Sequence, residues 1–242
     1  MEFGTNRSFC RRQFLCGCCV GTFIGFVPAI SQAADEIVPV RLEPHHHERF
    51  KNEYLRVIEV IIEPGDTTLF HRHELDIAAA ILAGADLKNE IPDNPQATIL
   101  HSKTKDVGFA GYQEQPYVHR VTNIGLSTFR IIAFEIVLPE PGQFDSSNRS
   151  EAPAYISELD NKRLHVWRLK LDPGQIAPAI AHSGPSLRVV LGGDQITETT
   201  AASPQRDFPV RPGAFEWQPA GPRSALDNTG QSALELVEFE LK

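Results

Sequence analysis

The chain has 242 residues, of which 41% are hydrophobic and 22% charged, as in an ordinary globular protein. Three basic residues and one acidic residue lie in the first 33 positions, so the remainder carries 20 Lys and Arg against 30 Asp and Glu, a net charge of −10. Such an acidic chain argues against nucleic acid and anionic lipid as partners. No long apolar run follows the N-terminal segment, so no membrane span is expected after it.

Residues 1–33 are typical of an export signal. A basic patch ending in Arg11 and Arg12 precedes an apolar stretch over residues 14–30, and small residues lead up to Ala33. The letters CRRQFL resemble the twin-arginine signal, which predicts cleavage after Ala33 and a periplasmic protein. The alternative is an anchor that stays in the membrane. All four Cys lie in this segment, so the remainder offers no disulfide, thiol nucleophile or sulfur ligand.

Three adjacent histidines, His45, His46 and His47, precede the first long apolar stretch. Neighbouring side chains of a strand point to opposite faces, so the three cannot all face one way. The segment 44–50 is therefore interpreted as solvated, with His45 or His47 at the rim of a pocket as the alternative.

Two further histidines, His71 and His73, lie within GDTTLFHRHELDIAAAILAG at 65–84, which otherwise reads as a buried strand. Side chains two apart share a strand face, and a buried polar group without a partner costs roughly 1–3 kcal/mol. A divalent metal satisfies both imidazoles, which suit Fe, Cu, Zn and Ni. A third ligand is expected from a neighbouring strand, where YVHRVTN supplies His119.

The sequence also repeats itself. NEYLRVIEVIIEPG at 52–65 aligns without gaps to NKRLHVWRLKLDPG at 161–174, and NIGLSTFRIIAFEI from residue 123 aligns to NTGQSALELVEFEL from residue 228. Two copies of one unit are predicted, at 34–138 and 156–242, with a linker at 139–155. Short β-branched segments bounded by Pro-Gly or Asn-x-Gly turns predict an all-β sandwich or small barrel, whose interior holds side chains or one small ligand.

These motifs resemble those of the cupin superfamily, and the resemblance covers the whole chain after the signal. It implies two tandem cupin barrels, that is, double-stranded β-helix or jelly-roll folds. The first family motif is matched by Gly65, His71, His73 and Gly84, and the second by Gly108, His119 and Asn123, although Glu114 and Pro116 replace its Pro and second Gly. The second copy keeps Gly213, Pro219, Gly221 and Asn228.

The departures from the family pattern define the site. Ile77 stands where the family has a Glu ligand, and strand alternation turns Asp76 outward and Ile77 inward, so a three-histidine site is predicted. Glu114 is a candidate fourth ligand, and Glu114 and His101 are the candidates for an acid or base. His101 lies on a strand that can face either inward or outward.

In the second copy, Ile180, His182, Ser186 and Ser224 occupy the four ligand positions. A single imidazole cannot hold a catalytic metal. That half is predicted to be a degenerate copy that shapes or supports the protein, with His182 in a core or on the surface.

Two functions follow from the resemblance. Cupins with three histidine ligands include Fe(II) thiol dioxygenases and some aromatic-ring-cleaving dioxygenases, which implies an oxidoreductase acting on a small organic molecule, with Ile77 and Tyr112 in the pocket. Zn, Mn or Ni are alternatives to Fe(II). The second function is a cupin that binds metal or a small ligand without turnover. No nucleic acid or membrane partner is expected after signal removal, and the oligomeric state stays open, a homodimer included.

Overall fold

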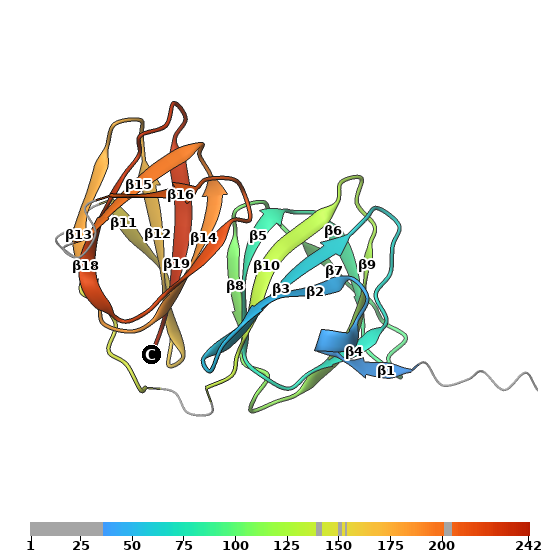
Figure 1. The fold of residues 1–242 in the computed structure, drawn as a ribbon. Coiled ribbons are helices and arrows are strands. Elements are labelled where there is room, and N and C mark those ends of the chain that lie inside the picture. The colour runs from blue at the N-terminus through green and yellow to red at the C-terminus, as the bar shows by residue number, and fades with distance from the viewer. Residues whose placement is uncertain (1–35, 139–141, 150–151, 153, 201–204) are drawn as a thin grey trace, which may run out of the picture. The chain divides into compact units, whose positions relative to one another are not determined.

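The computed structural model describes residues 36–138, 142–149, 152, 154–200 and 205–242. Within these ranges the chain forms short strands and one 3-10 helix, η1 (Val40–Leu42) (Figure 1). The all-β prediction is confirmed. None of the described residues forms a helix long and apolar enough to cross a membrane. The predicted export signal lies outside the described residues, as does part of the predicted linker, and the domain boundaries stay predictions.

The first half of the described chain forms two five-stranded sheets. One has the order β1-β4-β9-β6-β7 and the other β2-β3-β10-β5-β8. Their strands are β1 (Ile37–Pro39), β2 (His46–Lys51), β3 (Leu55–Ile62), β4 (Phe70–His73), β5 (Ile77–Ala83), β6 (Asp86–Glu90), β7 (Thr98–His101), β8 (Val107–Ala110), β9 (Tyr117–Asn123) and β10 (Phe129–Ile136). Every pairing between them is antiparallel except that of β1 with β4.

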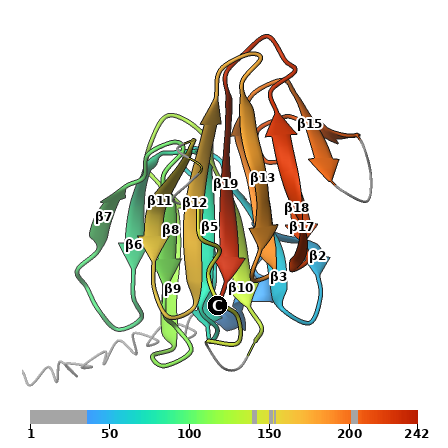
Figure 2. The same ribbon diagram turned by 90° about the vertical axis from the view of Figure 1, so that its left-hand side faces the viewer.

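The second half repeats this arrangement with a five-stranded sheet, β11-β12-β19-β14-β17, and a four-stranded sheet, β13-β18-β15-β16 (Figure 2). Its strands are β11 (Tyr155–Asp160), β12 (Leu164–Leu171), β13 (Ile176–His182), β14 (Ser186–Gly192), β15 (Gln195–Thr200), β16 (Arg206–Pro209), β17 (Phe215–Gln218), β18 (Gly221–Asp227) and β19 (Leu234–Leu241). Each half is thus a pair of sheets facing each other, a barrel.

The two aligned asparagines show that the repeat extends to individual hydrogen bonds. The Asn123 side-chain amide donates to two backbone carbonyls, of Ile62 at 2.9 Å and Ser127 at 2.8 Å. Asn228 donates in the same way to Leu171 at 2.9 Å and Ser232 at 3.0 Å. Both asparagines are fully buried. Each ties the turn before the last strand of its barrel to the end of an earlier strand, so both copies are closed by the same clamp.

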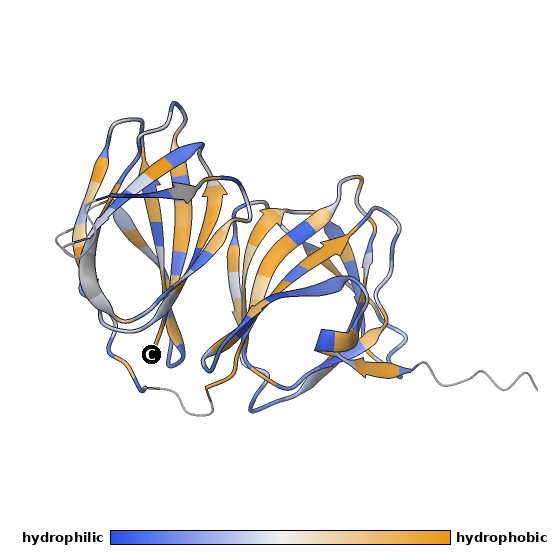
Figure 3. Cartoon of the chain, in the orientation of Figure 1, coloured by the Kyte–Doolittle hydropathy of each residue, from blue (hydrophilic) through white to orange (hydrophobic). Residues whose placement is uncertain are grey.

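The hydrophobic residues gather on the strands, as the colouring of Figure 3 shows for β5, β10 and β14. One buried cluster contains residues of both halves, among them Phe134 of β10 and Phe239 of β19. The two rings meet edge to face with centroids 5.2 Å apart. Burying a side chain of this size contributes roughly 1.5–3 kcal/mol. The two barrels therefore share part of their core.

A buried ion pair accompanies this shared core and overturns one expectation. Asp76 was expected to face outward by strand alternation, but β4 ends at His73 and β5 begins at Ile77, so alternation does not extend through residues 74–76. Asp76 is buried, and its Oδ2 lies 2.9 Å from Nε of the buried Arg163 in the second half. Its Oδ1 accepts the backbone N–H of Gln113 at 3.0 Å. Both carboxylate oxygens of Asp76 are therefore bound to other groups, and the side chain has a structural role instead of contacting the histidines.

Candidate metal centre

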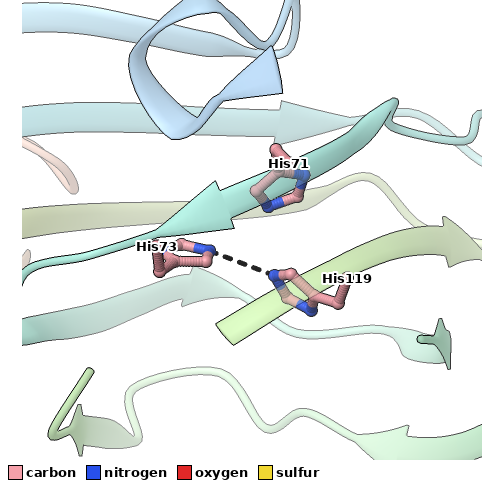
Figure 4. Close-up of side chains that lie close together, drawn as sticks. All are labelled: His71, His73 and His119. Atoms are coloured by element: carbon pink, nitrogen blue, oxygen red, sulfur yellow. Dashed lines mark hydrogen bonds between the residues drawn. The ribbon is translucent and has the colours of Figure 1, made fainter. Parts of the chain in front are cut away.

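Strand pairing brings the three predicted ligands together. On β4, His71 and His73 are buried while Arg72 between them is exposed, as alternation along a strand requires. In the antiparallel pairing of β4 with β9, His71 lies directly opposite His119, and residues in such positions have neighbouring side chains on one face. Figure 4 shows the three imidazoles converging from these two strands.

The three rings are in mutual contact. Their centroids are 4.5 Å apart for His71 and His119, 5.0 Å for His71 and His73, and 5.1 Å for His73 and His119. One nitrogen from each ring lies within 4.8 Å of the other two. The Nε2 atoms of His73 and His119 are 3.1 Å apart and share a hydrogen bond. Nitrogen atoms so close to one another form a ready set of metal ligands.

Hydrogen bonds fix the tautomers of two of the rings. Nδ1 of His71 lies 2.9 Å from the carbonyl of Leu69, and Nδ1 of His119 lies 2.6 Å from Oδ1 of Asn89. Both partners are acceptors, so each Nδ1 carries the proton and each Nε2 carries a lone pair. Such a partner on the far nitrogen is what orients a metal-binding histidine. Nδ1 of His73 is buried without a hydrogen-bond partner among the described residues.

Asn89 is itself held in place by an aromatic pair. It lies on β6, is buried, and donates from Nδ2 to the hydroxyl of Tyr117 at 2.8 Å. The ring of Tyr117 stacks on Tyr112 at 5.3 Å between centroids, and Tyr112 in turn lies 5.0 Å from the ring of His73. Asn89 is not among the site residues predicted from the sequence. Its position two residues after the buried Leu87 on one strand was the available signal.

The environment keeps the imidazoles uncharged. Burial, with a smaller contribution from the neighbouring imidazoles, lowers the pKa of His73 to about 3 and that of His119 to about 2. Burial also lowers the pKa of His71. Neutral imidazole is the form that ligates a metal. At neutral pH the three imidazoles are therefore already uncharged, and they can bind a cation without first releasing a proton to the solvent.

An apolar cavity of about 210 Å³ adjoins the three histidines. Its wall is formed mainly by aliphatic and aromatic side chains, including Ile58, Val60, Ile62, Ile77, Phe129 and Ile131. Beyond the three histidines, its polar lining residues are Thr68 and His46, and none of the described residues that line it is Asp, Glu, Lys or Arg. The cavity can hold a small molecule next to the three nitrogens.

His46 is the histidine of the PHHHERF segment that reaches this cavity. The segment is predicted to be solvated, with His45 or His47 at the pocket rim as the alternative, but His47 is exposed and His45 bonds to Glu43 at 3.0 Å. The side chain of His46 is only 6% exposed, and its ring lies 4.8 Å from that of His71. Because β2 begins at His46, strand alternation places His46 and His47 on opposite faces. The sequence alone does not show which of these faces is turned inward.

The other candidates from sequence lie elsewhere. His101 faces solvent with 73% of its side chain exposed and pairs with Asp86 at 2.7 Å. Glu114 is 76% exposed and pairs with Lys162 of the second half. Of the two predicted pocket residues, Ile77 lines the cavity, whereas Tyr112 packs against His73 and is not part of the lining. The structure therefore brings together His71, His73, His119 and Ile77, and places neither Glu114 nor His101 beside them.

The second barrel keeps the frame of the site without its ligands. Ile180 of β13 lies opposite Ser224 of β18, the same relationship as His71 and His119. His182 is buried, and within the described residues it belongs to no group of metal ligands. His182 and Ser224 line a pocket of about 290 Å³, but charged residues, among them Glu198 and Arg206, line it as well. Next to it the fully buried Arg188 is held at 3.0 Å by Glu238 and at 3.3 Å by Glu198.

No protein-family model matches the sequence, and no curated protein matches it. Solved structures do resemble the chain. AerE from Microcystis aeruginosa is 13% identical with a TM-score of 0.63, over 87% of this chain and 100% of that one. A salicylate 1,2-dioxygenase from Pseudaminobacter salicylatoxidans is 11% identical with a TM-score of 0.55, over 81% and 76%. An oxalate decarboxylase from Bacillus subtilis, described with Mn(II) centres, is 10% identical with a TM-score of 0.54, over 81% and 74%.

The chain has the cupin-barrel fold. At such low identities the likeness shows the fold alone, and the chemistry has to come from this chain's own residues. Three neutral imidazoles with two oriented Nε2 lone pairs fit a divalent transition metal. A carboxylate ligand is absent from the group that the described residues form, because Ile77 occupies the expected position and Asp76 is bound to Arg163.

Proposed function

We propose that this chain is an exported, metal-binding bicupin that holds one Fe(II) ion on His71, His73 and His119 and acts as an oxidoreductase of the dioxygenase type on a small organic molecule. Its second barrel, on this proposal, is a degenerate copy that supports the first. The observation that carries the proposal is the convergence of three buried, neutral imidazoles at one end of an apolar cavity of about 210 Å³.

The protein's own residues have separable roles in this function. The three histidines hold the ion, while Asn89 and the carbonyl of Leu69 orient two of them. The aliphatic wall, including Ile77, offers the substrate an apolar surface. When bound, a redox-active metal supplies the chemistry with oxygen and a fixed point for orienting the substrate. Three protein ligands leave coordination positions for other groups, which a site closed by four protein ligands does not.

Two of the similar structures support this reaction class. One is a salicylate 1,2-dioxygenase and another is an oxalate decarboxylase with Mn(II) centres, so proteins of this fold act on small organic molecules, and one of the two holds a metal. The identity of the metal is argued from the donors. A nitrogen-only set is suited to Fe, Zn, Cu and Ni, and of these we favour Fe(II), with Zn, Mn and Ni as the outcomes that metal analysis would distinguish.

A non-catalytic cupin that binds metal or a small ligand is the second candidate. One observation favours it: the acid and base candidates Glu114 and His101 are exposed and paired elsewhere. No carboxylate of the described residues lines the cavity, so a reaction that needs a protein carboxylate as base has none there.

Metal analysis followed by oxygen uptake separates the two candidates. The full chain would be folded in the cytoplasm and purified without chelators, its metals would be quantified, and oxygen consumption would be followed with small phenols, diketones, thiols and hydroxybenzoates. Stoichiometric iron with substrate-dependent oxygen consumption is the expected result. Tight metal binding without turnover across this set would instead support the binding protein, and a purified protein that takes up no divalent metal would refute both.

Export is a separate part of the proposal, and it is supported by the CRRQFL letters and the apolar stretch that follows them. Replacing Arg11 and Arg12 by Lys is expected to hold a tagged protein in the cytoplasm, as measured by cell fractionation, because the export machinery reads that pair. An unchanged distribution of the variant would contradict the twin-arginine assignment.

A further inference from the structure

We infer that the cavity beside the three histidines selects an uncharged, largely apolar molecule that carries one hydroxyl or enol group at its metal-facing end. This inference rests on the proposed function and narrows its substrate to a chemical class. It excludes small dicarboxylates and aromatic acids whose carboxylate points away from the metal.

The apolar wall of the cavity disfavours a charged group on the substrate. Ile58, Val60 and Ile62 of β3 approach from one sheet, together with Phe129 and Ile131 of β10, and Leu87 and Leu100 approach from the other. Thr68, the one hydroxyl in the lining, already accepts the backbone N–H of Val121 at 2.9 Å. An ionised carboxylate placed against the buried part of this wall, at Ile58, Ile62 or Leu87, would lose its water and find no cation among the lining residues. Burying an unpaired ion costs several kcal/mol or more.

The metal end of the cavity is different, because a bound ion there would favour one polar group of the substrate. Three neutral imidazoles would leave the charge of a divalent ion uncompensated, so the ion would favour the hydroxyl oxygen of a neutral substrate, which can lose its proton on binding. A second charged group cannot reach the same ion from the far wall. The substrate is therefore polar at one end and apolar at the other.

His46 supports a hydroxyl at the polar end. Its Nδ1 lies 2.8 Å from the carbonyl of Val40 and must therefore donate to it. Its Nε2 makes no hydrogen bond within the described residues, and the nearest carboxylate oxygen, of Glu43, is 3.7 Å away. A ligand hydroxyl can donate to this nitrogen beside the ring of His71.

The volume sets the size. A water molecule occupies about 30 Å³ in the liquid, so a cavity of about 210 Å³ offers the space of about seven waters. A single six-membered ring or a short branched chain fits within such a space.

Equilibrium binding to the iron-loaded full chain tests the inference without requiring turnover. The matched probes are 4-methylphenol and 4-hydroxybenzoate, which share a phenol and differ only in methyl against carboxylate at the far end. Isothermal titration under anaerobic conditions is expected to give at least about tenfold tighter binding for 4-methylphenol. Equal or tighter binding of 4-hydroxybenzoate, or binding of neither probe, would overturn the inference.

Two neighbouring residues of β7 provide a gain-of-function test with its control. Leu100 lines the cavity and is 44% exposed, whereas Ile99 is 45% exposed and is not part of the lining. In Leu100→Arg the preference is expected to shift toward 4-hydroxybenzoate by about tenfold, because the new guanidinium pairs with the carboxylate. Ile99→Arg adds the same charge outside the cavity and should leave the preference as it was. Equal shifts in both variants would show that general surface charge, not the cavity, sets it.

The hydroxyl requirement has its own comparison, 4-methylphenol against toluene. In His46→Leu, with iron content measured first, the advantage of 4-methylphenol over toluene is expected to fall, because one hydrogen-bond acceptor is lost. An unchanged advantage would remove His46 from the recognition of the hydroxyl.

These outcomes separate the inference from the proposed function. If the neutral probe binds preferentially and no substrate of the set consumes oxygen, the selectivity stands and the oxidoreductase fails. If oxygen is consumed only with hydroxybenzoates or dicarboxylates, the oxidoreductase stands and the inferred substrate class fails.

Discussion

The Nε2 atoms of His73 and His119 lie 3.1 Å apart although 46 residues separate them in the chain. This distance is set by the pairing of β4 with β9, in which Tyr117 lies opposite His73 and His119 opposite His71. Since the Nδ1 proton of His119 points to Asn89, the bond between the two rings uses a proton on Nε2 of His73. A metal held by the three histidines would take the place of that hydrogen bond.

Removing one of these ligands should remove the metal. His119→Ala leaves two imidazoles, and the purified variant is expected to retain less than about a tenth of the metal of the parent chain, as measured by elemental analysis after dialysis. His182→Ala is the control, because His182 occupies an equivalent ligand position in the second barrel but lies outside the three-histidine group. Full metal occupancy in His119→Ala would refute the three-histidine site.

Asn89 should affect the metal affinity of the site although it is not itself a ligand. Asn89→Leu removes the acceptor for Nδ1–H of His119, and loss of such a partner typically lowers metal affinity by about 10–100-fold. Competition with a chelator of known affinity measures the change. Lys88→Leu, on the opposite face of the same strand and 37% exposed at its side chain, is expected to keep the parent affinity. A matching loss in both variants would attribute the effect to β6 in general.

Acid should destabilise the metal-free protein. In the unfolded chain a histidine titrates near 6.5, whereas burial lowers the pKa of His46 to about 4, that of His73 to about 3 and that of His119 to about 2. Below pH 6.5 the unfolded chain therefore binds protons that the folded chain does not, and the free energy of unfolding falls as the pH falls, by up to about 1.4 kcal/mol per pH unit for each histidine.

Urea unfolding of the metal-free protein between pH 7.5 and pH 5 measures this slope. The variant that carries Gln in place of all three ligand histidines is the comparison, since it keeps His46 but lacks the three titrating ligands. Its free energy of unfolding is expected to fall less steeply with acid. Equal slopes for the variant and the parent chain would show that other groups govern the acid response.

The buried ion pair between Asp76 and Arg163 should matter more for stability than the exposed one beside it. Arg163→Met leaves the carboxylate of Asp76 buried, with 6% of its side chain exposed, and without its cation. Breaking such a pair on one side costs about 3–5 kcal/mol. Urea unfolding should show this loss, and Lys162→Met, which removes a largely exposed partner of Glu114, should change the midpoint little. Similar small changes in both variants would contradict a structural role for Arg163.

The sequence predicts much of this fold because its turns and alternation are local. The all-β architecture and the facing of His71 and His73 follow from patterns within a few residues, and the repeat follows from aligned stretches of the two halves. Asp76 shows where this reasoning ends: alternation fails where a strand stops, and its partner Arg163 comes from the other half of the chain. His46 and Asn89 were missed for a related reason. A polar residue inside a barrel is recognised only when the strand opposite it is known.

The ion pair of Asp76 and Arg163 also bears on how this protein can be divided. Asp76 lies three residues after a histidine of the metal centre, and Arg163 also donates to the carbonyl of Leu138, the last described residue before the predicted linker, at 2.6 Å. A fragment ending at that linker would leave a bare carboxylate and an apolar face that the second barrel now covers. The barrel with the candidate metal centre is thus not expected to fold stably as an isolated fragment, because residues of the second half complete its core and its buried ion pair.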